Sequence, residues 1–155
     1  MAFNQTREIL DHARDFHRRL SRFYTELQDL TQDSETRNLL NTLIAHENVL
    51  EGRLKEYEDG VSSNILDTFF KYMVDGTDSY FSAYEVPDQV DSKYVIEAAR
   101  YFDDCLSGYY REMARKALSE KVREILFNLM NLEMREQMSL SKRVLELNSS
   151  YYAHG

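Results

Sequence analysis

Residues 16–24, FHRRLSRFY, and residues 102–110, FDDCLSGYY, share the pattern that decides the fold. When Phe16 is aligned with Phe102, the residues Leu20, Ser21 and Tyr24 fall on Leu106, Ser107 and Tyr110 without a gap. The same offset aligns five further pairs: Arg37 with Arg123, Leu40 with Leu126, Leu43 with Leu129, Glu47 with Glu133 and Leu54 with Leu140. Matches at one fixed offset across two successive segments indicate an internal duplication.

Each copy of the repeat predicts two helices, because its apolar residues recur every three or four positions. The chain has one proline and five glycines, a scarcity that favours long helices over a turn-rich β fold. We expect helices from Asn4 to Leu30, from Asp33 or Ser34 to near Gly60, from Asp91 or Ser92 onward, and after Ser119 as far as Leu147. The sequence therefore predicts an all-α, single-domain protein spanning residues 1–155.

The predicted organisation is a four-helix bundle of two tandem hairpins, at about 4–59 and about 91–148, joined by a crossover at about 60–90. This connection is too long for a tight turn, and residues 63–73 resemble a short helix inside it. The crossover is rich in aromatic residues: Phe69, Phe70, Tyr72, Tyr80, Phe81 and Tyr84. Exposed aromatics predict a homodimer, with the alternative that they cover the core of their own chain.

Charge and composition exclude several classes of partner. The net charge is −8 and there is no basic run, which argues against binding to nucleic acid or to an anionic membrane surface. No stretch approaches the roughly 18 apolar residues that a membrane span needs, and the N-terminus has no signal-peptide pattern. The single cysteine, Cys105, fits a reducing compartment, so we expect a cytoplasmic protein.

Ionisable residues interrupt every apolar stripe. His17 does so in the first helix, Glu47 in the second, Asp103 in the third, and Glu133 with Glu136 in the fourth. His17 and Glu47 are each about 15 residues from the first expected turn, and Asp103 and Glu133 are equally far from the second. Equal distance from the turn means equal depth in a hairpin, so these residues should meet inside the bundle.

Two explanations of such a cluster remain open. Buried carboxylates repel one another, and a divalent metal such as iron or manganese would cancel that repulsion. One or two ions could be held by His17, Glu47, Asp103, Glu133 and Glu136. Alternatively there is no metal: a protonated His17 pairs with Glu47 or Glu133, and the hydroxyls of Tyr24 and Tyr110 complete a hydrogen-bonded network.

The chain resembles the ferritin-like superfamily, especially its rubrerythrin-like branch. Phe23-Tyr24 and Tyr109-Tyr110 match an aromatic landmark of that family, and residues 37–47 and 123–133 resemble the runs that lead to its metal-binding glutamates. The resemblance implies metal-ligand roles for Glu47 and Glu133. His17 and Asp103 stand where the family has a first-helix glutamate, and Leu50 and Glu136 stand where it has a histidine.

The resemblance implies a metal-binding protein, with iron as the leading metal and oxidoreductase chemistry on oxygen or peroxide. The alternative is a non-enzymatic bundle that has lost its metal and acts as a partner-binding or structural protein. His12 and His46 lie beside the apolar stripes, so we expect both at the rim or in solvent. Cys105 is expected in the core or at an interface.

Overall fold

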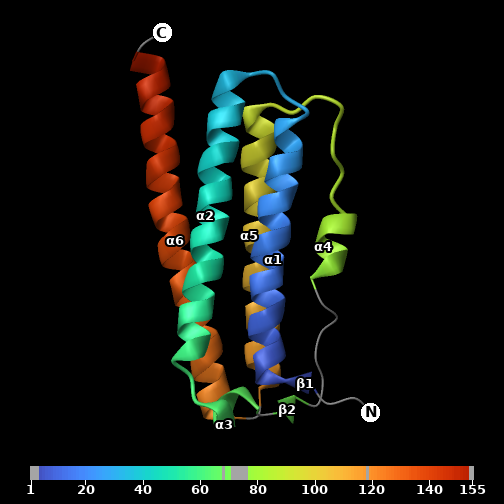
Figure 1. Ribbon diagram of the computed structural model, residues 1–155, viewed down its shortest axis with the longest axis vertical. Helices are drawn as coiled ribbons and strands as arrows, with labels where there is room; N and C mark the ends of the chain where they lie inside the picture. The colour runs from blue at the N-terminus through green and yellow to red at the C-terminus, as the bar shows by residue number, and fades with distance from the viewer. Residues whose placement is uncertain (1–3, 68, 71–76, 118, 154–155) are drawn as a thin grey trace.

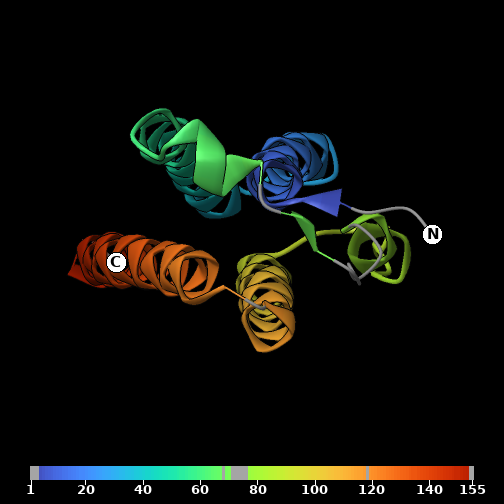
Figure 2. The same cartoon turned by 90° about the horizontal axis from the view of Figure 1, so that it is seen from below.

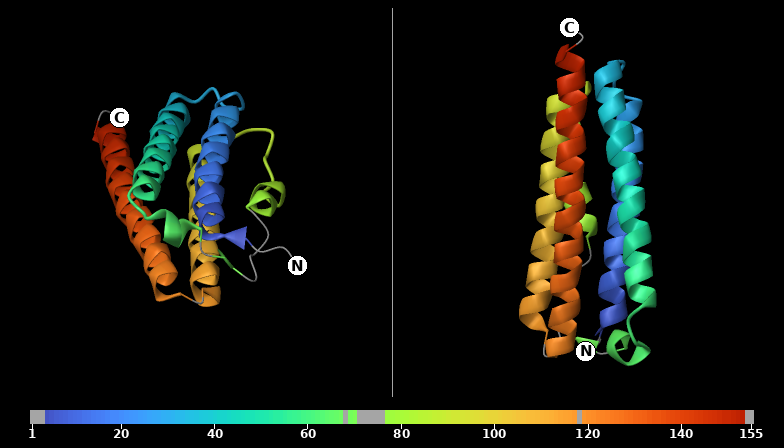
Figure 3. Two further views of the ribbon diagram at one scale, coloured as in Figure 1. Left: turned by 60° about the horizontal axis from the view of Figure 1, so that its bottom comes forward. Right: turned by 90° about the vertical axis from the view of Figure 1, so that its left-hand side faces the viewer.

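Four long helices dominate the structure, a computed structural model that describes residues 4–67, 69–70, 77–117 and 119–153. They are α1 (Thr6–Gln28), α2 (Ser34–Asp59), α5 (Ser92–Lys116) and α6 (Glu120–Ala153). The α1–α2 hairpin forms one layer and the α5–α6 hairpin the other, with α1 and α6 running opposite to α2 and α5 (Figures 1 and 3). The prediction of an all-α protein is confirmed.

The helix starts follow the capping residues in the sequence. The Asp33 carboxylate accepts a hydrogen bond from the Thr36 amide at 3.1 Å, and Asp91 accepts one from the Tyr94 amide at 2.8 Å. Both bonds satisfy amides that the first helical turn leaves without a partner. Gly60 caps the C-terminus of α2, where the sequence predicted its end.

The chain before α1 is not helical, which corrects the predicted start at Asn4. Residues Asn4–Gln5 form β1, which pairs antiparallel with β2 (Phe69–Phe70). This short bridge attaches the N-terminal segment to the crossover, at the end of the molecule seen in Figure 2. None of the helices in the described ranges is both long and apolar enough to cross a membrane.

The crossover contains two short helices, α3 (Ser63–Leu66) and α4 (Asp78–Ser82). The predicted helix over 63–73 is therefore wrong at Phe69 and Phe70, which are extended. Residues 71–73, with Tyr72, lie outside the described residues. No pattern in the sequence indicated α4.

Three crossover aromatics cover the core of their own chain. The ring of Phe81 stacks on Phe102 with centroids 4.8 Å apart, and Tyr84 stacks on Tyr101 at 4.6 Å. The rings of Tyr80 and Phe16 pack edge to face, with their centroids 6.3 Å apart. Because these rings are used internally, the aromatic content of α4 and the segment after it does not support a homodimer interface there.

Repeat-equivalent residues meet at the centre of the molecule. The rings of Phe16 and Phe102, which correspond in the duplication, lie 6.2 Å apart, and both are almost completely buried. Tyr24 and Tyr110, another equivalent pair, are also buried. The duplicated pattern thus marks the layer where the two hairpins pack together.

Phe102→Ala should lower the free energy of unfolding by about 3–5 kcal/mol, because it leaves a cavity beneath the crossover. Chemical denaturation at low protein concentration measures the change. Phe127→Ala is the matched control: its ring is 53% exposed, and its loss should cost under about 1 kcal/mol. Equal losses in the two variants would contradict the packing described.

Candidate functional site

His17 lies at the centre of the bundle, on α1, with both ring nitrogens facing carboxylates. Nδ1 makes a short contact with Oε2 of Glu47 on α2, and Nε2 lies 2.8 Å from Oε1 of Glu133 on α6. The side chains of His17 and Glu47 are each 2% exposed, and that of Glu133 is 14% exposed. Three of the four residues that the depth argument brings together therefore meet, and the fourth is Asp103.

The charges of these three groups determine the protonation state of His17. Burial by itself would lower the pKa of the imidazole, but the carboxylates of Glu133 and Glu47 outweigh it and hold the pKa well above its ordinary value. A protonated imidazole has a donor on each nitrogen, which matches one carboxylate oxygen at each end of the ring. The group is therefore an imidazolium held between two carboxylates, which we call the His17 clamp.

Two tyrosines border the His17 clamp. The Tyr110 hydroxyl donates to Oε1 of Glu133 at 3.2 Å, so this carboxylate oxygen has both a phenol and the imidazole as partners. The pKa of Tyr24 is raised by burial and then by the charges of Glu47 and Asp103, which keeps the phenol neutral. Burial likewise raises the pKa of Glu47, although the neighbouring His17 opposes the shift.

Asp103, on α5, lies next to the clamp. Its Oδ2 accepts a hydrogen bond from Nε2 of Gln137 at 2.9 Å. Burial first, and then the charges of Glu47 and Glu133, raise the pKa of Asp103 to about 8. At neutral pH this carboxyl group is therefore mainly protonated and adds little negative charge to the cluster.

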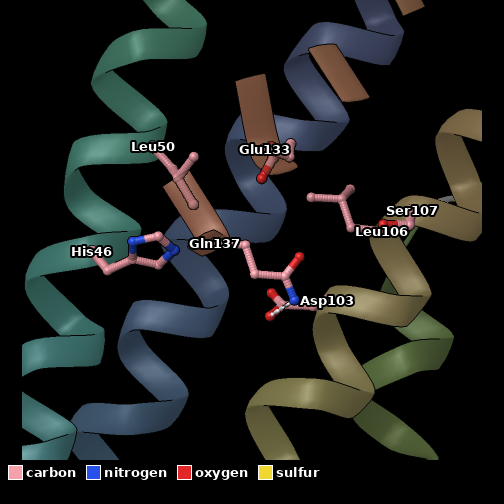
Figure 4. Close-up of a pocket in the computed structure, with 7 residues that line it drawn as sticks. All are labelled: His46, Leu50, Asp103, Leu106, Ser107, Glu133 and Gln137. Carbon is pink, nitrogen blue, oxygen red and sulfur yellow. Dashed lines mark hydrogen bonds between the residues drawn. The ribbon is translucent and has the colours of Figure 1, made fainter. Parts of the chain in front are cut away.

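A cavity of about 10 Å³ separates Asp103 from α2, and Figure 4 shows the side chains around it. Glu133, Gln137 and Asp103 border one side, and His46 and Leu50 the other. The volume is that of a single water molecule, and the lining supplies the polar partners that a buried water needs. The site has no space for a larger ligand.

His46 is a buried member of this region, which corrects its predicted place at the rim. The residue is 2% exposed, and its Nδ1 has no hydrogen-bond partner among the described residues. Burial, followed by the nearby positive charge of His17, lowers the pKa of His46 to about 4, so the ring is neutral. Its position three residues after Leu43 could have indicated burial, because residues three apart share a helix face.

Glu136 does not join the cluster. Its Oε1 lies 2.8 Å from Nε of Arg53 on α2, so its charge is compensated there. Leu50, which corresponds to Glu136 in the duplication, is buried and borders the small cavity. The two halves thus differ at this position in both chemistry and location. His12, also expected at the rim, is partly buried, with Nδ1 3.4 Å from the Tyr109 hydroxyl.

The fit of a metal can be tested on this geometry. A metal binds imidazole through a nitrogen lone pair, and both nitrogens of His17 face carboxylates as hydrogen-bond donors do. In the ranges that the structure describes, no group of three or more histidine, cysteine, aspartate or glutamate side chains is arranged to hold an ion. As arranged, the residues fit a hydrogen-bonded ionic network better than a coordination sphere.

Comparison with known proteins adds no relative: no family model, no curated protein and no solved structure matches the chain. The fold and site by themselves define the class, an all-helical protein with a histidine–carboxylate cluster buried between its two hairpins.

Asp103→Asn should make stability less dependent on pH. The folded pKa of Asp103, about 8, lies above the unfolded value near 4, so its stabilising contribution is complete below pH 4 and is lost as pH rises toward 8. The asparagine variant lacks this loss. Its unfolding free energy relative to the parent should therefore be higher at pH 9 than at pH 5, by at least about 2 kcal/mol.

Denaturant titrations at pH 5 and at pH 9 measure the unfolding free energies of the variant and the parent. Asp104→Asn is the matched control, because Asp104 is an exposed neighbour on the same helix. A pH effect equal in the two variants would show that Asp103 ionises normally.

Proposed function

We propose that this chain is a ferritin-like four-helix bundle that carries a metal-free ionic network in its interior and acts by binding a protein partner. The observation that carries the proposal is the His17 imidazole with a carboxylate on each nitrogen. In this proposal the proton on His17 does what a metal ion would otherwise do: it supplies the positive charge that lets Glu47 and Glu133 lie close together.

The arrangement of the helices supports the ferritin-like part of the proposal. Two antiparallel hairpins are joined by a long crossover, so that α2 and α5 run in the same direction (Figure 1). This is one of the known topologies of four-helix bundles, and it agrees with the sequence resemblance. A cytoplasmic location remains part of the proposal, supported by the lone Cys105.

The lack of space at the cluster argues against catalysis on a substrate there. Ligand pockets usually have volumes of roughly 300–1,000 Å³. The cavity beside Asp103 measures about 10 Å³. By contrast, α6 exposes several large apolar residues on the surface, a feature typical of protein interaction sites.

The convergence of His17, Glu47, Glu133 and Asp103 favours a second candidate, a metal-binding oxidoreductase. Iron or manganese would be held by these side chains and would supply redox chemistry on oxygen or peroxide. His17 would first have to lose a proton and turn one nitrogen away from its carboxylate. Glu136 would have to leave Arg53 to take part.

Metal content and melting temperature distinguish the two candidates. We expect protein produced in iron-supplemented medium to contain no stoichiometric metal. Its melting temperature should not change with chelator, iron or manganese, because ligands stabilise only when they bind the folded state. A stoichiometric ion whose removal lowers the melting temperature would overturn the proposal in favour of the metal-binding candidate.

His17→Gln should destabilise the fold by about 3 kcal/mol or more at neutral pH, because it leaves the buried Glu47 and the largely buried Glu133 without their counter-charge. Glu47→Gln should have a smaller effect, since the His17–Glu133 pair remains. The double variant, His17→Gln with Glu47→Gln, should be more stable than His17→Gln alone. Thermal and denaturant unfolding of all three measure the coupling. A double variant no better than the single one would contradict the clamp.

A further inference from the structure

Helix α6 has apolar residues on two opposite faces. One face packs into the core through Val122, Leu126, Leu129 and Leu140, all buried. The other face exposes four large apolar side chains, which we call the α6 stripe: Phe127 at 53%, Met134 at 55%, Met138 at 68% and Leu145 at 66%. A helix on the surface of a monomer ordinarily presents polar residues opposite its core face. The α6 stripe therefore needs an explanation.

The spacing of the α6 stripe makes it a straight line along the helix. Its members are separated by seven, four and seven residues, and at 3.6 residues per turn all four lie within about 20° of a common direction. Phe127 and Leu145 are five turns apart, so the stripe is about 27 Å long. The core-facing leucines Leu126, Leu129 and Leu140 point away from this direction by at least about 100°. The stripe is thus separate from the core.

The C-terminal part of α6 has little support from its own chain. At 34 residues α6 is the longest of the described helices, and its C-terminal end extends past the neighbouring helices (Figures 1 and 3). Between Ser141 and Glu146 only Val144 is partly buried. Short helical segments are only marginally stable in water without packing. A partner lying on the α6 stripe would stabilise this part of the helix.

We infer that the α6 stripe is the interface for a second copy of this chain, paired antiparallel across a twofold axis that crosses the stripe midway between Met134 and Met138. The spacing of the four stripe residues, seven, four and seven positions, is the same from either end of the helix. An antiparallel copy therefore places Phe127 against Leu145 of the second copy, and Met134 against Met138 of the second copy. A twofold interface needs such self-complementarity. The inference rests on the proposed partner-binding function and names its partner.

The residues beside the apolar positions determine how the pairing depends on salt. Asn131 and Ser141, both uncharged, lie about 40° to either side of the stripe and at the same height in this register. Arg135 is the charged residue nearest the axis, and it lies across from its own copy. The resulting repulsion is screened by salt, so association should strengthen as ionic strength rises.

The size of the α6 stripe determines how strongly two copies should associate. A strip about 27 Å long and one helix wide, roughly 10 Å, has an area on the order of 300 Å² per copy. Stable dimers bury about 800 Å² per partner, so this dimer is a weak one. It should dissociate on dilution to micromolar concentrations.

Sedimentation equilibrium of the full chain, from about 10 μM to about 1 mM, tests the inference. The average mass should rise with concentration from 18.4 kDa toward twice that value. Met138→Glu should weaken association by at least about tenfold, because it buries a charge at the axis. Ser139→Glu adds the same charge to the exposed neighbouring position and should have little effect.

The double variant Met134→Lys with Met138→Glu tests the direction of pairing. In the antiparallel register each lysine faces a glutamate of the second copy, so association should exceed that of Met138→Glu. In a parallel pair, like charges would meet and association would be weakest. Circular dichroism checks that every variant is folded.

A parent protein that remains monomeric at the highest concentration would overturn the inference. A dimer weakened equally by Ser139→Glu and Met138→Glu would do the same. Neither outcome changes the melting behaviour with chelator and metal, which tests the proposed function separately. Binding of a different protein to α6, with the parent monomeric, would overturn the second-copy inference and leave the partner-binding function in place.

Discussion

The structure depends on one buried cation. The imidazolium of His17 lies between Glu47 and Glu133, and these three residues come from three different helices. Burial lowers the pKa of the imidazole and so disfavours its protonated form. That form persists because the carboxylates of Glu133 and Glu47 are close. The clamp joins the first hairpin to the second through the contact from His17 to Glu133. Its two contacts require α1, α2 and α6 to meet at one depth.

The duplication explains why this cation matters. A symmetric repeat would place equivalent residues from its two halves opposite each other, and two glutamates, Glu47 and Glu133, do occupy equivalent positions. The first-helix positions differ: one half supplies His17 and the other Asp103. Because one is basic and the other is mainly protonated at neutral pH, the centre carries far less negative charge than four carboxylates would. The break in symmetry therefore makes a metal-free core tolerable.

Sequence patterns predicted the parts of the fold that depend on local rules. The caps at Asp33 and Asp91, the end at Gly60 and the meeting of His17, Glu47 and Glu133 follow from capping chemistry and helix periodicity. Glu136 shows the limit of the depth argument. It lies at nearly the same height as Glu133, but a three-residue step turns it toward Arg53, a partner the stripe pattern does not reveal.

The path of the crossover could not be predicted, and the burial of His46 was missed, for a different reason. The packing of Phe81 on Phe102 and of Tyr84 on Tyr101 depends on where the connection returns across the bundle, which no local pattern specifies. His46 is buried because α6 covers that face of α2. Its position beside the apolar stripe had predicted a place at the rim of the bundle. A stripe on one helix marks only the face that packs on one neighbouring helix, and a second neighbour can bury the residues beside it.

The protonation state of His17 is the most direct test of this account. Nuclear magnetic resonance of protein labelled with ¹⁵N-histidine reports the state of both ring nitrogens during a pH titration. The account predicts that both nitrogens of His17 stay protonated above pH 7, beyond the range in which an ordinary histidine titrates. A His17 ring that is neutral at pH 7, or that has one nitrogen bound to a metal, would contradict it.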